Sequence, residues 1–361
     1  MADRRMWAII MLGVNTRLAV DVQVGPETFS SLEQEWKGLL RRSGADTIFM
    51  TWDWQQTWWE WFGQESRLSV VKIRDGAELL GLVPLCTQGN GPERRTFRLA
   101  GGVEVSDYLD LIVAADAREV QTYEAFWRWL TQDCDEGWDL LDLHNVPASS
   151  PSLRRLPALA EASGEFEVSL HVEEVCPVIT LPSTWDEYLS SLSKKERHEV
   201  RRKVRKANRE ATVGCYYADD PSSLYGELED FIALHRTSAD PKSSFMDDRM
   251  QGFFHALAEA AQHNGWLRLA FLLVNKVKAS AMLCFRYGNA FQVYNSGYDP
   301  ELYPELSTGI VLLSYCIRGA IKEGLEFFDF LRGEEEYKYR LGAERTEIYN
   351  LKIARRGSTH V

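Results

Sequence analysis

The sequence predicts an α/β protein with mixed sheets, built from two tandem domains whose helices cover both faces of each sheet. Three observations support this fold class. The chain has 361 residues, a length that suits two domains. The same order of predicted helices and strands occurs twice along it. Each copy ends in an apolar strand with an aspartate at its third position, which reads LLDL at residues 140–143 and FFDF at residues 327–330.

The first copy begins with two amphipathic helices, in which apolar residues recur every three or four positions. Short apolar runs follow, and residues 74–77 between the first two have the composition of a turn. The predicted elements are helices at 27–43 and 52–62, strands at 68–73, 79–86, 96–99 and 108–113, a helix at 120–134 and a strand at 138–143.

The second copy repeats this order. Its predicted elements are helices at 224–235 and 246–263, strands at 267–273, 278–287 and 290–296, a helix at 308–323 and a strand at 325–330. Two similar orders, each over about 120 residues, favour a duplication. Two unrelated α/β domains are the alternative.

Prolines are frequent between residues 146 and 183, which suits a junction between the copies. We expect an N-terminal extension at 1–26, an N-terminal domain at 27–146, a junction at 147–183 and a C-terminal domain at 184–361. The extension holds an apolar run at residues 6–14 that is too short to span a bilayer and precedes no small-residue cleavage site. It is an extra segment or reflects a start codon assigned too early.

The composition excludes several functions. With a net charge of −12 and a pI near 5.2, the chain is not expected to bind DNA or to insert stably into a membrane. Its six cysteines form no CxxC pair, which predicts reduced thiols and a cytoplasmic location. No cluster of His and Cys has the spacing of a metal site, so we expect no metal. Walker A, GxGxxG, HExxH and GxSxG patterns are absent from the sequence.

The most informative stretch reads YNSGYDPELYPELSTG at residues 294–309 and, after the predicted helix, FDFLRGEEEYKYRLGA at residues 328–343. These motifs resemble the GNAT acyltransferases of the branch that includes CelD-type acetyltransferases and the FemAB peptidyltransferases. The resemblance extends more loosely over residues 47–353. It implies two tandem GNAT-like domains with the acyl-transfer site in the C-terminal one.

A donor site is expected where the predicted helix of the second copy begins. The free N–H groups and the dipole at a helix N-terminus can hold a pyrophosphate. We therefore expect acetyl-CoA or another acyl-CoA to bind at Leu306, Ser307, Thr308 and Gly309. A plain N-cap at Ser307 or Thr308 is the alternative. The corresponding residues 113–119 contain no glycine, so we expect no donor site in the N-terminal domain.

Three charged residues are candidates for catalysis. Asp329 lies within an apolar strand, where a carboxylate is costly unless it is paired, and Arg332 and Lys338 are close enough in sequence to pair with it. Asp329 is either a base or substrate anchor in the cleft, or part of an internal ion pair. The resemblance implies that Lys338 faces the cleft. The alternative for Lys338 is a surface lysine paired with the glutamates at residues 334–336.

Three tyrosines complete the catalytic candidates. Tyr294, Tyr298 and Tyr337 each carry a hydroxyl that can return a proton to a leaving thiolate, and Tyr337 is also a candidate for binding substrate. Packing is the alternative for each ring. In the first copy, Asp142 is the expected counterpart of Asp329, and we expect His144 beside it to be structural.

A run of basic residues precedes the second copy. Residues 194–209 contain nine Lys and Arg, and helical spacing places Arg201 and Arg205 on one side and Arg202 on the adjacent one. Such density repels itself unless it meets anions. We expect these three arginines to bind an anionic part of a substrate: a nucleotide-linked sugar, a coenzyme phosphate or a tRNA backbone.

The sequence thus predicts a GNAT-type N-acyltransferase that moves an acyl group from acyl-CoA to an amine, without a covalent enzyme intermediate. The resemblance suggests a small-molecule amine as acceptor: an amino sugar, a nucleotide sugar or a precursor of the envelope, of cellulose or of another exopolysaccharide. One alternative is a FemAB-like peptidyltransferase that uses aminoacyl-tRNA. The other is a GNAT-like scaffold in polysaccharide assembly, without catalysis.

Overall fold

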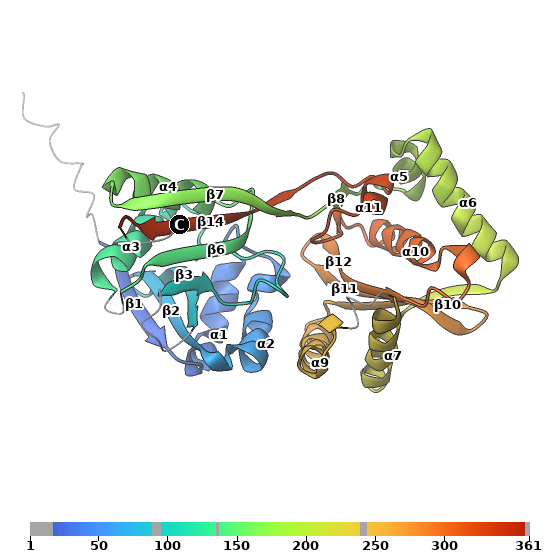
Figure 1. Cartoon of the computed structure of the whole chain (residues 1–361), viewed down its shortest axis with the longest axis horizontal. Helices are drawn as coiled ribbons and strands as arrows, with labels where there is room; N and C mark the ends of the chain where they lie inside the picture. The colour runs from blue at the N-terminus through green and yellow to red at the C-terminus, as the bar shows by residue number, and fades with distance from the viewer. Residues whose placement is uncertain (1–16, 89–94, 135–136, 239–243, 358–361) are drawn as a thin grey trace, which may run out of the picture.

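The computed structural model describes residues 17–88, 95–134, 137–238 and 244–357, in which two α/β halves lie side by side (Figure 1). Each half has one mixed sheet with helices on both faces. The predicted fold class is therefore confirmed.

The N-terminal sheet is antiparallel except where β4 runs parallel to β6. In spatial order its strands are β1 (Ala19–Val24), β2 (Ser66–Asp75), β3 (Glu78–Gln88), β4 (Thr96–Leu99), β6 (Leu140–Pro147), β14 (Glu347–Arg355) and β7 (Phe166–Val175), and the short β5 (Ile112–Val113) pairs with β3.

The helices of this half are α1 (Glu27–Leu40), α2 (Trp52–Phe62), α3 (Glu119–Arg128) and α4 (Ser152–Ser163). Helix α1 forms because Phe29, Leu32 and Trp36 recur at helical spacing and are buried together. Helix α2 starts at Thr51, whose hydroxyl accepts a hydrogen bond from the Trp54 N–H. A turn of π-helix, Trp129–Asp133, extends α3.

The C-terminal sheet has the order β8 (Val178–Thr180), β13 (Phe327–Asp329), β12 (Ala290–Tyr298), β11 (Val277–Tyr287), β10 (Leu267–Val274) and β9 (Val213–Ala218). Strands β12 and β13 are parallel, as β4 and β6 are in the first half. They pair over three residues only, because β13 ends at Asp329 while β12 continues to Tyr298. The repeated order of elements predicted from the sequence is present in the structure.

Helices α7 (Leu224–Thr237) and α9 (Asp248–His263) cover one face of this sheet, and α10 (Thr308–Lys322) covers the other (Figure 1). Helices α5 (Trp185–Ser191) and α6 (Lys194–Glu210) lie between β8 and β9 in sequence, and α6 packs on the outside of α10. The short α11 (Glu336–Arg340) follows β13.

The two halves exchange strands, which the predicted boundaries did not foresee. Strand β14, at the end of the chain, lies between β6 and β7 in the N-terminal sheet. The chain runs from β7 in that sheet to β8 in the C-terminal sheet within three residues, and Val178 bridges to Glu344 on the return path. The junction expected at 147–183 is therefore folded, and the C-terminal domain expected at 184–361 lends its last strand to the other half.

An aromatic core joins the halves across α2 and α9. Trp54 packs edge-on against Phe253 and Phe285, with ring centroids 6.1 and 5.9 Å apart. Gly252 packs so closely on Trp61 that a Cβ atom there would lie 2.0 Å from the indole ring. One cluster of buried apolar side chains consequently draws on both halves around this contact, and a second cluster lies on the α10 side of the C-terminal sheet.

Two predictions fail near the N-terminal sheet. The expected extension contains β1, whose residues pair with β2, and the apolar run at residues 6–14 lies outside the described residues. The strand expected at 108–113 is reduced to Ile112–Val113, because the Leu111 N–H donates to the Asp110 side chain and the Leu109 N–H donates to the Asn145 carbonyl instead of to a neighbouring strand ladder.

Within the described part of the chain, no helix is long and apolar enough to cross a membrane.

The exchanged strand makes a prediction about stability. Leu351 on β14 is fully buried in the N-terminal core, so Leu351→Ala should lower the free energy of unfolding by about 2–5 kcal/mol, measured by urea denaturation. Val277→Ala, which truncates a half-exposed side chain on β11, is the control and should change it by less than about 1 kcal/mol. Equal effects of the two changes would show that β14 does not complete the sheet.

Candidate functional site

A cavity of about 460 Å³ opens at the N-terminus of α10. Ser307 is the N-cap residue, in a left-handed backbone conformation with φ of 52°, and its side chain makes no capping hydrogen bond. Tyr303 is also left-handed, so two non-glycine residues hold strained conformations around the turn Pro304–Leu306. The N–H groups of the first turn of α10 therefore lack a side-chain cap and face the cavity, where the helix dipole favours an anion.

Strand β12 forms the floor of this cavity. The register between β11 and β12 shifts after Leu283, so that Tyr294 is an extra, bulged residue on β12. Beyond the bulge, Ser296 and Tyr298 line the cavity together with Met282 of β11. Gly297 faces the opposite way, where a Cβ atom would lie 2.3 Å from the backbone nitrogen of His235 in α7.

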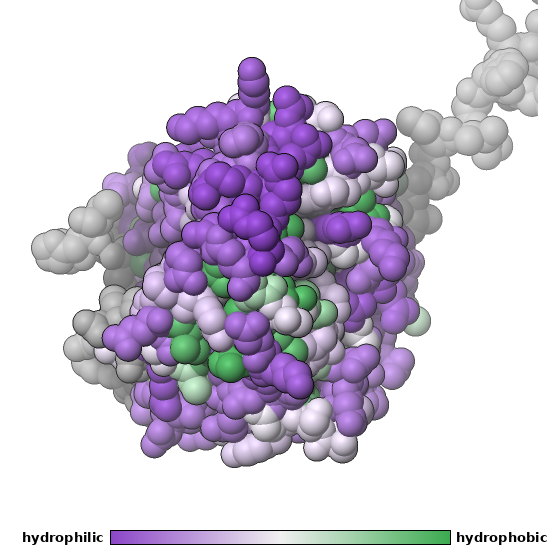
Figure 2. Space-filling model, turned by 90° about the vertical axis from the view of Figure 1, so that its right-hand side faces the viewer, coloured by the Kyte–Doolittle hydropathy of each residue, from purple (hydrophilic) through white to green (hydrophobic). Residues whose placement is uncertain are grey.

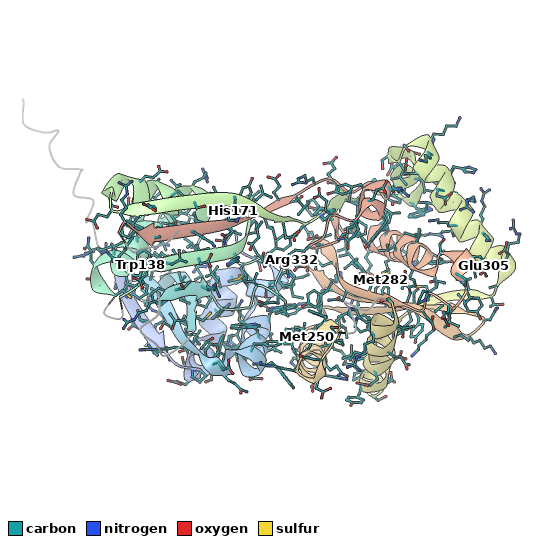
Figure 3. All side chains as sticks on the ribbon, in the orientation of Figure 1. Trp138, His171, Met250, Met282, Glu305 and Arg332 are labelled. Carbon is teal, nitrogen blue, oxygen red and sulfur yellow. The ribbon has the colours of Figure 1, made fainter. Side chains whose placement is uncertain are left out.

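The predicted donor residues lie together at this cavity. Ser307, Thr308 and Gly309 line it, whereas Leu306 is buried beneath them and anchors the turn. Lys206 of α6 donates a hydrogen bond of 3.0 Å to the Glu305 carbonyl, which ties the turn to the basic helix. In Figure 3, Glu305 lies at the outer edge of the second half, and Met282 lies between Glu305 and Arg332.

The cavity lining carries acidic and phenolic groups. Asp299 and Glu335 contribute carboxylates, and Tyr298, Tyr303 and Tyr337 contribute rings. Among the described residues that line it, none is a lysine or an arginine. Sequence reasoning missed Asp299, Tyr303 and Glu335, although Asp299 and Tyr303 stand within the 294–309 motif and Glu335 stands three residues before Lys338.

Asp329 lies at the boundary between the halves and not in the cavity. Its carboxylate accepts hydrogen bonds from the Tyr108 hydroxyl of the first half, at 2.9 Å, and from the Leu331 N–H, at 2.8 Å. Burial raises the pKa of Asp329 to about 7, and these hydrogen bonds offset only part of that effect. The expected pairing of Asp329 with Arg332 or Lys338 is thus wrong, because Tyr108 occupies its second oxygen.

Arg332 is bound to the first half. Its guanidinium forms an ion pair with Asp107 and donates to the Glu104 carbonyl at 3.1 Å. Figure 3 shows Arg332 between the two halves. Arg332 therefore fastens the loop of residues 104–108 to the turn after β13, and it does not line the cavity.

Lys338 is almost fully buried and does not face the cavity. Its ammonium donates to the carbonyls of Arg332 and Gly333, each at 2.9 Å, and lies 3.4 Å from two further carbonyls of the same turn. It also pairs with Glu335 at 2.9 Å. Lys338 thereby holds the turn in which Leu331 is left-handed, with φ of 54°, and places Glu335 at the cavity.

The three tyrosine candidates lie in different positions relative to the cavity. Tyr294 points to the face of the sheet opposite the cavity, where its hydroxyl donates to the Val105 carbonyl at 2.8 Å. Tyr298 is half-exposed at the mouth of the cavity. Tyr337 lines the cavity and packs edge-on against Phe330, and burial raises its pKa above the ordinary value. Of the three candidates, Tyr298 and Tyr337 therefore lie where they can reach a ligand in the cavity, and Tyr294 does not.

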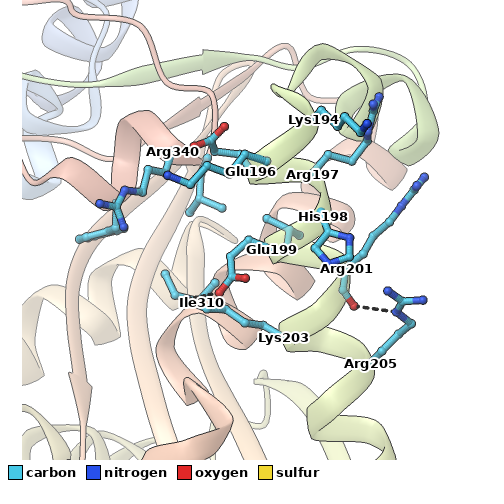
Figure 4. Close-up of a pocket in the computed structure, with 14 residues that line it drawn as sticks. Lys194, Glu196, Arg197, His198, Glu199, Arg201, Lys203, Arg205, Ile310 and Arg340 are labelled. Carbon is cyan, nitrogen blue, oxygen red and sulfur yellow. Dashed lines mark hydrogen bonds and ion pairs between the residues drawn. The ribbon is translucent and has the colours of Figure 1, made fainter.

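A second, larger cavity of about 950 Å³ runs along α6 and shares Ile310 and Tyr337 with the first. Figure 4 shows Glu199 and Lys203 pointing toward Ile310, whereas Arg201 and Arg205 point away from it. Arg202, expected to act with them, instead forms two hydrogen bonds of 2.7 and 2.8 Å with Glu199 and lines neither cavity.

In the described part of the first half, the cavity at the matching place is small. Helix α3 begins at Glu119, and the cavity beside it has a volume of about 40 Å³. Although burial alone would raise the pKa of Asp142, hydrogen bonds from His144 and Asn350 lower it below its ordinary range. His144 lies between Asp142 and Glu173, as a structural group would. Among the described residues, no group of three His, Cys, Asp or Glu could hold a metal ion.

Comparisons with known proteins agree with this architecture. Residues 194–339 match the family model of the acetyltransferase (GNAT) domain. The structure of FemX superposes with a TM-score of 0.63 at 12% identity, over 88% of this chain and 95% of that one. A tandem GNAT protein from the clavulanic acid biosynthesis pathway superposes with a TM-score of 0.51 at 10% identity, over 95% of this chain and all of that one.

L-PGS from Bacillus licheniformis superposes with a TM-score of 0.54 at 11% identity, over 90% of this chain and 92% of that one. None of the curated proteins compared with the chain matches it significantly in sequence. The expected fold is thus confirmed: a tandem GNAT-like protein with FemAB-like architecture, whose C-terminal half carries the GNAT domain.

The environment of Lys338 predicts a structural role. Lys338→Ala leaves buried carbonyls without a donor, so it should lower the free energy of unfolding by about 3 kcal/mol or more in urea denaturation. Arg340→Ala, in the same helix but exposed and paired only with Glu336, should cost less than about 1 kcal/mol. A Lys338→Ala protein as stable as Arg340→Ala would contradict this assignment.

The raised pKa of Asp329 predicts that the stability of the protein depends on pH. The unfolded chain releases this proton near pH 4 and the folded protein near pH 7, so the folded state binds more protons between these values. The free energy of unfolding should therefore fall as pH rises through this window, by about 2–4 kcal/mol from this group. Asp329→Asn can still accept from the Leu331 N–H with its oxygen, while its NH2 group donates to the Tyr108 hydroxyl oxygen. It should remove that fall, in urea denaturation at pH 4.5 and 7.5. An unchanged pH dependence would show that Asp329 ionises normally.

Proposed function

We propose that the protein is an N-acyltransferase that moves an acyl group from acetyl-CoA or another acyl-CoA to an amine, at the cavity over the N-terminus of α10. The uncapped first turn of α10 carries this proposal, because its N–H groups are free to bind the donor pyrophosphate. The match of residues 194–339 to the GNAT domain supports it.

The neighbouring cavity along α6 supplies the cations that the first cavity lacks. The two share Ile310 and Tyr337, so a ligand that crosses the start of α10 reaches both. In the proposed arrangement, Lys203 and Arg340 lie near the donor phosphates and the acyl end lies over Ser296. Arg201 and Arg205 contribute to the local positive potential without direct contact.

The proposed chemistry is direct attack on the thioester. The ammonium of the acceptor loses a proton to Glu335 or Asp299, and the free amine forms a C–N bond to the acyl carbon as the C–S bond breaks. The Tyr298 hydroxyl protonates the leaving thiolate, and the resulting phenolate takes the surplus proton from the nitrogen of the new amide, which restores the hydroxyl. Lys338, Asp329 and Arg332 act indirectly in this scheme, because they hold the turn that presents Glu335.

The acceptor is proposed to be a small-molecule amine, for which the two carboxylates of the cavity provide electrostatic attraction. An amino sugar, a nucleotide sugar or another precursor of the envelope or of an exopolysaccharide fits this description. We place the reaction in the cytoplasm, which suits the six free cysteines. The N-terminal half, with its small cavity, is proposed to bind no donor.

Likeness in fold to FemX favours one other donor, an aminoacyl-tRNA in a FemAB-like transfer. The chemistry at the acyl carbon would be the same, and the donor would differ. A scaffold without catalysis is the third reading, and it would show no turnover with either donor.

A substitution at Gly309 is expected to change donor binding without changing stability. It lines the cavity, and a Cβ atom there would meet no other atom within 4 Å, so Gly309→Val should leave the free energy of unfolding within about 1 kcal/mol of the parent. The new side chain would cover the N–H groups of the first turn. We expect the saturable rise of the melting temperature with acetyl-CoA to need at least tenfold more ligand in this variant.

Gly226→Val on α7, where a Cβ atom also meets open space, is the matched control and should keep the response of the parent. No shift of the parent with millimolar acetyl-CoA, CoA or longer acyl-CoAs would refute an acyl-CoA donor. It would leave the aminoacyl-tRNA and scaffold readings. A shift that Gly309→Val leaves unchanged would place the donor elsewhere.

A further inference from the structure

Strand β7 forms a long edge of the N-terminal sheet. Among the strands in the described part of the chain, β14 alone pairs with it, and its other side faces outward. With ten residues, β7 is longer than the other edge strands, since β1 and β9 have six residues each and β8 has three. Figure 1 shows β7 along the upper border of the first half. A long outward edge is a template on which another strand can pair.

The backbone of β7 directs alternate hydrogen-bonding groups to this edge. The Arg356 N–H donates to the Glu165 carbonyl at 2.9 Å, so these two residues form a hydrogen-bonded pair. Such pairs alternate along antiparallel strands, and β7 keeps one register with β14 from residue 166 to residue 172. The residues whose N–H and C=O groups point away from β14 are therefore Phe166, Val168, Leu170 and Val172.

Apolar side chains are exposed along the same edge. Leu170 is 44% exposed and Val172 is 39% exposed, although both lie on the face from which Phe166 packs into the core. Residues 166–172 contain no lysine or proline, the residues that commonly prevent pairing at an edge. Edge strand β9, in contrast, directly follows the charged helix α6, and Figure 2 shows hydrophilic side chains gathered over the upper part of that end of the molecule.

A second copy of β7 matches these apolar side chains. In an antiparallel pair centred on Ser169, Val168 of each copy lies opposite Leu170 of the other, and Phe166 lies opposite Val172. The same residues carry the outward backbone groups, so the two strands can exchange hydrogen bonds at each of these pairs. A two-fold axis through the centre makes the contact self-complementary.

Charge on the opposite face of the strand selects this register. Centring on Ser169 places Glu167 of each copy opposite His171 of the other, where an imidazole N–H can donate to the carboxylate. Figure 3 shows His171 on β7 at the upper border of the first half. Centring on Leu170 instead would place Glu167 opposite Glu173, two carboxylates that repel each other.

We propose that the protein forms a two-fold symmetric homodimer in which β7 pairs antiparallel with β7 of a second copy, centred on Ser169. The pairing joins the two N-terminal sheets into one continuous sheet through about eight backbone hydrogen bonds. It also covers the exposed Leu170 and Val172. No residue of β7 lines the cavity over α10, so the dimer does not depend on the acyl-transfer reaction.

The test is sedimentation velocity of the full-length protein from roughly 1 to 100 µM. The parent should shift with concentration from 41.3 kDa to twice that mass. Leu170→Pro removes an N–H that points away from β14, so it should weaken dimerisation at least roughly tenfold while the midpoint of urea denaturation stays unchanged. A parent that remains monomeric throughout would overturn the proposal and leave the edge to a different protein or to residues 1–16 of the same chain.

Charge exchange tests the register without proline. His171→Glu places two carboxylates opposite each other and should weaken dimerisation roughly 3- to 30-fold. Adding Glu167→Lys should restore it to within about threefold, although the two residues lie roughly 13 Å apart on one strand and cannot meet within one chain. Glu174→Lys, exposed on β7 beyond the paired residues, is the matched control and should change the affinity less than about threefold. Absence of rescue, or an equal effect of the control, would overturn this pairing.

Oxidative cross-linking locates the centre of the pair. Two Ser169→Cys chains bring their Cα atoms to about 4.5 Å, within the range of a disulfide, so they should cross-link. His171→Cys lies on the same face, but its two copies would be roughly 13 Å apart and should not cross-link. Equal cross-linking of the two variants would show that the strands have no fixed register and would overturn the proposed dimer.

Discussion

The last strand of the chain, β14, lies between β6 and the edge strand β7, in a sheet whose other strands all come from the first half of the sequence. Without it, the backbone groups of both neighbours would lose their partners. In return, β8 closes the C-terminal sheet beside β13, directly after the chain leaves β7. Each half therefore reaches its native sheet only when the other is present, and the two should fold as one cooperative unit.

This exchange determines what surrounds the candidate site. Because the sheets are joined end to end, the loop that carries Asp107 and Tyr108 is brought against the turn after β13. That turn is left-handed at Leu331, and Lys338 binds its carbonyls from inside. None of the described residues of the first half lines the cavity, yet its contacts fix the segment that ends in Glu335 at the cavity wall. A domain outside the cavity can in this way still determine the geometry of the cavity in its neighbour.

Local patterns in the sequence were sufficient to predict the order of elements, the fold class and the position of the α10 turn. Each of these features depends on residues that are close together in the chain. Pairing between distant segments carries no such signature. The partner of Asp329 is Tyr108, more than two hundred residues away, and the face of α6 that packs on α10 is likewise decided by a distant segment. Burial of Lys338 was equally hidden, since its acceptors are backbone carbonyls, which every sequence possesses.

The distribution of charge explains how an acidic protein can attract an anionic ligand. The chain carries a net charge of −12, and a field averaged over the molecule would repel phosphates. Salt screens that average beyond a distance of about 10 Å, so a ligand near α6 responds mainly to the cations around it. Those cations lie outside the cavity over α10, whose own lining is acidic. Under the proposed function, the anionic donor and the cationic acceptor would thereby be drawn to adjacent surfaces of the same half.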